Sequence, residues 1–156
     1  MPQHPDLLIV LADGEHARFV RPDRNNVLRT EWALDSLSAH RRSAELRTDR
    51  PGAAFHSDSS AHHALAPRHD PQALEQRKFA QLLADRINTA AECRDFGELI
   101  IVAPRRMLAA IRDNLDPTTA SRIVGALAKD LVKISDSGLR PHVERWIGPL
   151  RRAGAR

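Results

Sequence analysis

Two short apolar runs restrict the folds that are open to this chain. Residues 7–12 read LLIVLA and residues 98–103 read ELIIVA. An unbroken apolar run of this length is typical of a strand that is buried on both faces of a sheet. We therefore expect a sheet that contains these two strands, with helices that cover it.

Two alternating segments predict the rest of the first half of the sheet. Residues 15–20 and 27–37 alternate between apolar and polar side chains, and Asp13-Gly14 is typical of a tight hairpin turn. In the second segment the alternation places four side chains on one face: Leu28, Thr30, Trp32 and Leu34. With residues 21–26 as a loop, the pattern indicates three antiparallel strands.

Helical signals dominate the second half of the chain. Asp70 is a good N-cap and Pro71 a good first helical residue. The face that this helix buries is expected to contain Phe79, Leu82, Leu83, Ile87, Ala90 and Ala91. Pro104 and Asp116-Pro117 predict two further helix starts, the first with Met107, Leu108, Ile111 and Leu115 inward.

The end of the chain has one ambiguous segment and one clear helix. Residues from Ile123 to Leu131 fit a strand or a helix by pattern alone. The closing helix is expected to bury Leu139, Val143, Trp146, Ile147 and Leu150. Its Pro141 is acceptable if it falls in the first turn, where a backbone N–H has no helical partner.

The order of these elements predicts one α/β domain. Three antiparallel strands followed by βα units favour a single mixed sheet with helices that cover it. The length of 156 residues fits one domain, which we assign to residues 1–150, with 151–156 as a basic tail.

Composition indicates the kind of protein and of partner. The first residues, MPQHPD, lack a basic signal-peptide region, and Leu7–Ala12 is too short to span a membrane. We expect a soluble, cytoplasmic protein that does not contact a membrane. Arginine supplies nearly all of the formal net charge of +4, and its planar donors suit phosphate, although a genome rich in arginine codons explains the composition equally well. Since tyrosine is absent and aromatic residues are scarce, RNA contacts are expected mostly at phosphate.

The segment 47–71 is the main candidate for function. It lacks any periodic pattern, and such segments, when longer than about 12–15 residues, are usually functional or disordered. The side chains that we predict to contact RNA or another partner are Arg47, Arg50, His63, Arg68 and His69. Residues with a predicted structural role in turns, anchors and caps are Asp13, Gly14, Asp49, Pro51, Gly52, Phe55, Pro67 and Asp70.

Two other kinds of site were weighed against this surface. Histidines cluster in or beside the segment, at His40, His56, His62, His63 and His69, but the chain lacks HExxH and Cys–His ligand patterns. We therefore expect no metal and no cofactor. A metal-dependent nuclease could instead use carboxylates at strand ends, namely Asp13, Asp35, Asp49 and Asp130. A turn residue at Asp13, a capping or ion-pairing residue at Asp130 and a half-buried helix residue at Cys93 are the favoured interpretations.

Several blocks in order resemble the bacterial host-attachment family, described as "protein required for attachment to host cells". They read LLIVLADGEHARFV, TDRPGAAF, HALAPRHDP, EQRKFAQLLADRI, FGELIIVAPRRMLAAIRDNL and AKDL. The resemblance covers Leu7 to about Leu139. The typical RHAMEP of the family appears here as HHALAP, so the chain departs from the family at His62 and Ala66.

That family is similar in turn to the middle domain of class-1 release factors and of Pelota. The resemblance implies an RNase H-like mixed sheet and a strand over Ile123–Leu127. Release factors carry a Gly-Gly-Gln tripeptide in the loop before the long helix, and this sequence lacks it. The resemblance therefore implies a non-enzymatic module that binds RNA or the ribosome through residues 47–70. The alternatives are an adhesion-related factor and a metal-dependent hydrolase.

Overall fold

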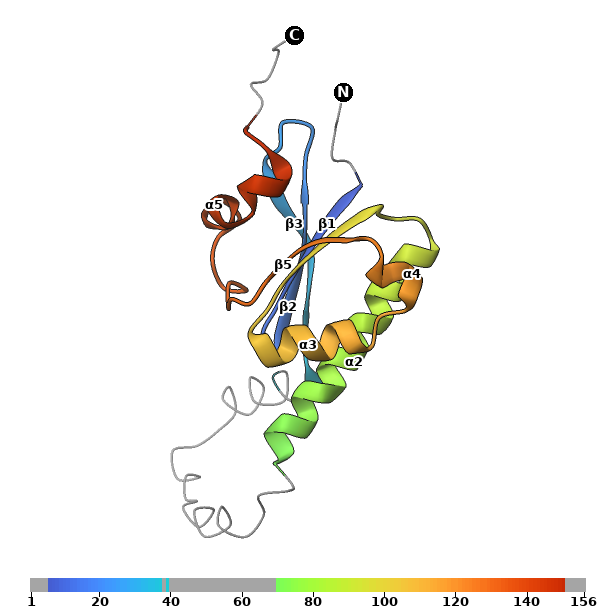
Figure 1. Cartoon of the computed structure of the whole chain (residues 1–156). Coiled ribbons are helices and arrows are strands. Elements are labelled where there is room, and N and C mark those ends of the chain that lie inside the picture. Colours follow the sequence, from blue (N-terminus) through green and yellow to red (C-terminus); the bar gives the residue numbers. More distant parts are fainter. Residues whose placement is uncertain (1–5, 38, 40–69, 151–156) are drawn as a thin grey trace, which may run out of the picture.

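The computed structural model describes residues 6–37, 39 and 70–150, which form a five-stranded mixed sheet with helices around it (Figure 1). The strands are β1 (Leu7–Ala12), β2 (His16–Pro22), β3 (Leu28–Asp35), β4 (Glu98–Val102) and β5 (Ile123–Leu127). The helices are α2 (Pro71–Glu92), α3 (Arg105–Asp113), α4 (Pro117–Ala120) and α5 (Asp136–Ile147).

The strand order is β3-β2-β1-β4-β5, with antiparallel pairing from β1 to β3 and parallel pairing among β1, β4 and β5. This confirms the expected α/β class and its RNase H-like arrangement. The ambiguous segment Ile123–Leu127 is a strand. The second strand continues two residues into the expected loop, to Pro22.

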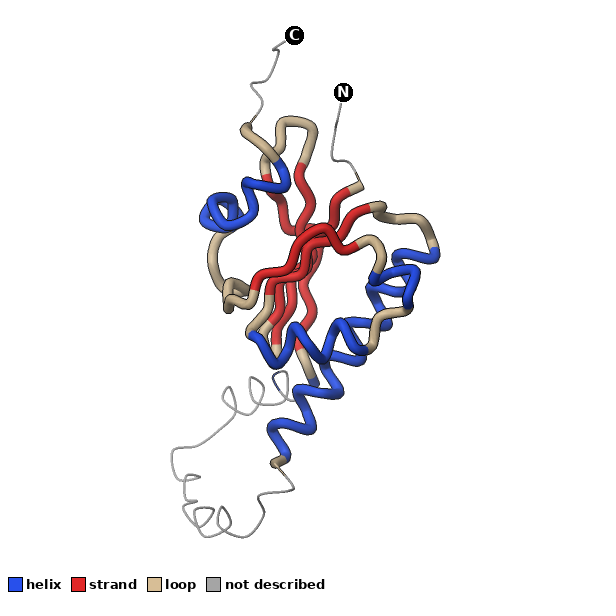
Figure 2. Tube along the Cα trace, viewed as in Figure 1, coloured by secondary structure: helices blue, strands red, loops and turns tan. Residues whose placement is uncertain are grey.

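The central strand β1 buries side chains on both faces of the sheet, as predicted. Leu8, Val10 and Ala12 belong to the core that α2 and α3 cover. Leu7, Ile9 and Leu11 belong to the core that α5 covers. Figure 2 shows the same layers, with α2, α3 and α4 on one side of the sheet and α5 on the other.

Helix α2 begins where the sequence predicts. The Asp70 carboxylate accepts a hydrogen bond from the Gln72 N–H at 3.0 Å, and Pro71 is the first helical residue. One expected core residue is wrong, because Leu82 is 37% exposed while its neighbour Leu83 is buried. Successive residues of a helix lie about 100° apart, so Leu82 falls at the border of the buried face.

A bulge in the edge strand β3 overturns the predicted common face of its side chains. Phe19 pairs with Trp32 but Val20 pairs with Thr30, so Glu31 is the extra residue. An extra residue reverses the alternation. Leu28 therefore joins the core under α5, whereas Leu34 packs against the core under α2.

The other edge strand, β5, has a matching irregularity. Leu99 pairs with Ile123 and Ile100 pairs with Gly125, so Val124 is skipped and 42% exposed. Bulges twist an edge strand and hinder pairing with another molecule. Both edge strands of the described sheet therefore have a bulge that hinders pairing with a strand of another molecule.

Helix α5 differs from its sequence expectation at two points. It begins at Asp136, so Pro141 is its sixth residue and lies beyond the first turn. The carbonyl of Ser137 consequently lacks its helical N–H donor. Leu150 follows the helix and is 56% exposed, because α5 already ends at Ile147.

An ion pair joins α5 to the sheet across more than a hundred residues of sequence. The Arg18 guanidinium, on β2, donates to the carbonyl oxygens of Val132 and Ile134 and to Asp136 Oδ1 at 2.9 Å. The Asp136 carboxylate also accepts from the Thr30 N–H at 3.0 Å and from Thr30 Oγ1 at 2.6 Å. The start of α5 is therefore fixed to both β2 and β3.

These contacts lower the pKa of Asp136. Burial alone would raise the pKa, but the two hydrogen bonds from Thr30 and the ion pair with Arg18 outweigh burial. Because the carboxyl is more acidic in the folded than in the unfolded protein, its ionisation stabilises the fold above the ordinary value of 3.8. That contribution is lost as the pH falls through the lowered pKa of the folded state.

The substitution Asp136→Asn should lower the free energy of unfolding near neutral pH by about 1 kcal/mol, since the charged acceptor is lost at a partly exposed site. The stability of this variant should also fall less than that of the wild type as the pH drops below about 4. Urea unfolding at several pH values measures both effects. Asp130→Asn is the control, because within the described residues Asp130 forms no hydrogen bond or ion pair. Equal acid sensitivity of all three proteins would contradict the role of Asp136.

The substitution Gly125→Ala should destabilise the protein by about 1–3 kcal/mol through overpacking. A Cβ at Gly125 would lie 2.4 Å from Trp146 Cε2, so the indole that packs α5 on β5 would have to move. Gly97→Ala is the matched control, because the nearest atom to its Cβ is Asp6 Cβ at an ordinary 3.4 Å. Chemical denaturation should show that Gly125→Ala lowers the free energy of unfolding in the wild-type protein and lowers it much less in a Trp146→Leu background. If the two substitutions have additive effects, Gly125→Ala does not act through a clash with Trp146.

Candidate nucleic-acid interface

The carboxyl ends of four strands meet at one edge of the sheet. Strands β1, β4 and β5 are parallel, and β3 runs in the same direction because β2 is antiparallel to both of its neighbours. In open α/β sheets this edge is the usual place for ligands. We call it the carboxyl edge and define it by Asp13 and Gly14 after β1, Arg105 and Arg106 after β4, and Lys129 after β5.

The start of α2 also lies at the carboxyl edge. A pocket of about 380 Å³ is lined by Gly14 from the β1–β2 turn, Ser36 from the end of β3, and Pro71 from α2. The described residues that flank segment 40–69 are therefore at this edge. Figure 1 shows the edge at the lower end of the sheet, beside the first turns of α2.

Asp13 lies in the turn between β1 and β2 and caps its backbone. Its Oδ1 accepts hydrogen bonds from the N–H groups of Glu15 at 2.7 Å and His16 at 2.6 Å. Gly14 lies close to α2, because a Cβ there would be 2.7 Å from the Gln76 side chain, which would have to shift. The turn therefore packs directly against the long helix.

The acidic residues at strand ends do not gather around one point. Asp35 pairs with His16, whose Nδ1 lies 2.9 Å from Asp35 Oδ1, while Asp13 binds backbone N–H groups. Over residues 6–37, 39 and 70–150, no three histidine, cysteine or carboxylate side chains are placed to share a metal ion. Asp49, which belongs to the same hypothesis, lies outside the described residues.

Two further sequence interpretations require correction. Asp130 is exposed and forms no capping or ion-pair contact in the described part of the chain, and Asp136 fills that role instead. Cys93 is the C-cap residue of α2 and is exposed, so it is not half buried.

All five predicted contact residues fall outside the described part of the chain. They are Arg47, Arg50, His63, Arg68 and His69, and so are the predicted structural residues Asp49, Pro51, Gly52, Phe55 and Pro67. Of the predicted set, the structure describes Asp13 and Gly14 in the turn and Asp70 as the N-cap of α2. These three lie at the same edge of the fold.

Four well-covered arginines have structural partners. Arg18 binds the start of α5, and Arg21 pairs with Glu31 at 2.8 Å and Asp95 at 2.7 Å. Arg122 donates to the carbonyl oxygens of Ala91 and Phe96, which closes the end of α2. Arg140 donates to the carbonyl oxygens of Asn26 and Gly148.

Arg105 and Arg106 are different. Both are exposed in the first turn of α3, and neither forms an ion pair or hydrogen bond within the residues that the structure describes. The first turn of α3 contains no acidic residue. Because the amino end of a helix carries a partial positive charge, two arginines there raise the local potential and attract anions.

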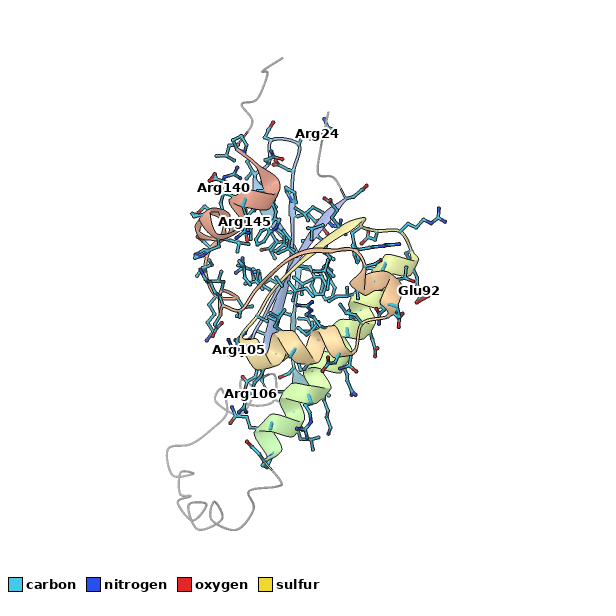
Figure 3. The ribbon with its side chains drawn as sticks, in the orientation of Figure 1. Arg24, Glu92, Arg105, Arg106, Arg140 and Arg145 are labelled. Atoms are coloured by element: carbon cyan, nitrogen blue, oxygen red, sulfur yellow. The ribbon has the colours of Figure 1, made fainter. Side chains whose placement is uncertain are left out.

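The positive charge extends from Arg105 and Arg106 to neighbouring elements. Arg77 of α2 and Arg106 line a groove of about 320 Å³ between α2 and α3, with Met107 in its wall. On the other side, Lys129 Nζ lies 3.5 Å from His142 Nδ1 of α5. Figure 3 shows Arg105 and Arg106 beside the first turns of α2, with Arg24 at the opposite end of the molecule.

Sequence reasoning missed Arg105 and Arg106 as candidates. One local signal was present, since two arginines follow Pro104 at a predicted helix start, where acidic residues are preferred. That signal gives no information on pairing, and only the fold shows which arginines lack a carboxylate partner.

Comparison with solved structures finds a likeness to an archaeal translation termination factor, aRF1. The TM-score is 0.42 and the sequence identity is 9%, over 89% of this chain and 38% of that chain. The chain thus spans well under half of the length of that protein. Curated proteins include no match to this sequence. None of the helices in the described residues has the length and apolarity that crossing a membrane requires.

A family model matches most of the chain. It is described as "Protein required for attachment to host cells", and the match runs over residues 8–143. The match includes the whole sheet and the carboxyl edge, and it ends within α5. The chain therefore belongs to the family of proteins required for attachment to host cells.

Proposed function

We propose that this protein is a non-enzymatic module that binds RNA, alone or in the ribosome, through its carboxyl edge. Arg105, Arg106 and Lys129 supply cationic contacts from the fold itself. The neighbouring segment of the sequence adds the contacts predicted above: Arg47, Arg50, His63, Arg68 and His69. The contacts are directed to phosphate groups, and the protein performs no reaction on its partner.

The observation that supports this proposal is that the adjacent Arg105 and Arg106 form no ion pair or hydrogen bond within the part of the chain that the structure describes. The half-buried arginines form ion pairs or donate hydrogen bonds to carbonyl oxygens, so they have structural roles in the fold. The two at the start of α3 stand at a helix end that is unfavourable for cations. A surface that keeps uncompensated guanidinium groups together is suited to a polyanion.

The chemistry favours a nucleic-acid backbone over a small anion. The exposed cations are spread over α2, α3 and the segment after β5, so they form a strip rather than an enclosed pocket. Guanidinium groups bind phosphate oxygens through two parallel hydrogen bonds, and several such contacts along a strand release counterions. Arg68 and His69 directly precede Asp70 in the sequence, which would continue the strip into the neighbouring segment.

The family description favours a second, adhesion-related function. A protein that binds RNA inside the cell would act on attachment indirectly, whereas an adhesion factor would act at the cell surface. Fractionation of cells that express the protein separates the two possibilities. Recovery with ribosomes supports the RNA-binding proposal, and recovery on the outer surface supports the adhesion function.

The substitution pair Arg105→Ala and Arg106→Ala should weaken binding to single-stranded RNA by roughly tenfold at low salt. The plot of log affinity against log salt should become shallower by about 1.4, because each lost phosphate contact removes about 0.7 from the slope for single strands. The same variant should be slightly more stable to heat, by a few tenths of a kcal/mol, since cations leave the amino end of α3. Fluorescence anisotropy with labelled RNA and thermal denaturation measure these effects.

A control variant removes the same charge elsewhere. Arg24→Ala with Arg112→Ala takes one arginine from the far end of the molecule and one from the last turn of α3. Its salt dependence should match that of the wild type, and its stability should not rise. If both double variants lose RNA affinity equally, RNA binding depends on total charge and not on the carboxyl edge. If the wild type neither binds RNA nor sediments with ribosomes at low salt, the proposal is wrong.

A further inference from the structure

Trp32 is the most exposed aromatic side chain among the described residues. Its exposed fraction is 39%, whereas Phe19, Phe79 and Phe96 are at most 3% exposed. The bulge at Glu31 sets this position, because it turns Trp32 to the same face of the sheet as α2. Large exposed aromatic groups are common at binding surfaces.

The indole ring is held in one orientation from the inside. Phe19 of the neighbouring strand stacks on it with ring centroids 4.2 Å apart and an angle of 6° between the planes. Because Phe19 belongs to the packed core, it forms a fixed support. One face of the Trp32 ring is therefore packed, and the ring reaches solvent at the outer edge of the sheet, where β3 has no further neighbour.

A cation lies over this ring, on the face opposite Phe19. The Cζ atom of Arg86 of α2 lies 5.7 Å from the Trp32 ring centroid. Within the described residues, Arg86 forms no ion pair with a carboxylate, so its charge stays available. Leu82, one helical turn before Arg86, is 37% exposed and adds apolar surface to the same face of α2.

We propose that Trp32 and Arg86 form a nucleotide-binding site. An unpaired base displaces the Arg86 guanidinium from the indole face opposite Phe19 and stacks there, and the phosphate of the nucleotide pairs with Arg86. Aromatic rings and guanidinium planes are the groups on which proteins stack splayed-out bases. The choice of ligand rests on the proposed RNA binding, and the site adds a base contact to the phosphate contacts of the carboxyl edge. The site also selects single-stranded over duplex RNA, because both faces of a base inside a duplex are stacked on neighbouring bases.

The surroundings fit a nucleotide better than an apolar protein surface. Among the described residues, Arg86 lies over the Trp32 ring, and Glu31, the next residue along β3, is a charged side chain that pairs with Arg21. Stable protein interfaces bury about 800 Å² on each partner and have an apolar centre. A single ring with an adjacent cation matches one base and one phosphate.

The chain provides an internal control in Trp146. Arg145 Cζ lies 4.7 Å from the Trp146 ring centroid, so this is also an arginine–tryptophan pair. The Trp146 ring, however, is wedged against Gly125 and packs α5 on the sheet. In a Trp146→Phe background, Trp32 becomes the only tryptophan and its fluorescence reports this site alone.

The test titrates the Trp146→Phe protein with a short oligoadenylate, with an abasic strand of the same length, and with adenosine monophosphate. We expect saturable quenching of Trp32 emission by the two ligands that contain bases and none by the abasic strand. Trp32→Leu should weaken oligoadenylate binding roughly tenfold and leave binding of the abasic strand unchanged. Trp32→Phe should lose less, because it keeps a flat ring, and thermal denaturation checks that both variants fold.

Each outcome bears on one of the two proposals. Quenching that persists in the Arg105→Ala, Arg106→Ala variant, with its weaker binding of the abasic strand, supports both sites. Quenching by adenosine monophosphate without any binding of the abasic strand supports the Trp32 site and rejects the carboxyl edge. Tight binding of both strands without quenching, or equal losses for both in Trp32→Leu, overturns the Trp32 site. A wild-type dimer that Trp32→Leu turns into a monomer would show a protein contact instead and also overturns it.

Discussion

The burial of β1 on both faces is the constraint on which the rest of the structure depends. Its side chains alternate between two cores, so the sheet needs a cover on each side. Helices α2 and α3 supply one cover directly, through a long amphipathic face. The second cover, α5, is short and interrupted by Pro141, and it relies on Arg18 and Thr30 to hold its first residue.

The same fold divides the arginines into two groups. Arg18, Arg122 and Arg140 cross between elements that are distant in the sequence and satisfy backbone carbonyls or a carboxylate. Within residues 6–37, 39 and 70–150, Arg105 and Arg106 have no such partners at the carboxyl edge. The half-buried guanidinium groups close the fold, and the adjacent pair at the start of α3 is the part of the remaining positive charge on which the proposed function rests.

Most elements could be predicted from local pattern, because their signals are local. The apolar run of β1, the cap at Asp70 and the turn at Asp13 each depend on neighbouring residues. The failures arise where a distant partner decides. Alternation alone placed Trp32 and Thr30 on one face, but the pairing of β3 with β2 inserts Glu31 and separates them. The candidate site was missed for the same reason, since ion pairing across the fold determines which arginines remain free.

Local pattern by itself determined strands β1 to β4, the starts of α2, α3 and α4 and the mixed α/β class, because periodicity and capping act over a few residues. It also supplied the family resemblance that the match over residues 8–143 confirms. Only the tertiary structure decided the exposure of Trp32, the attachment of α5 through Arg18 and the grouping of Arg105, Arg106 and Lys129 at one edge. Those properties depend on strand order and register, which bring together residues that the chain keeps far apart.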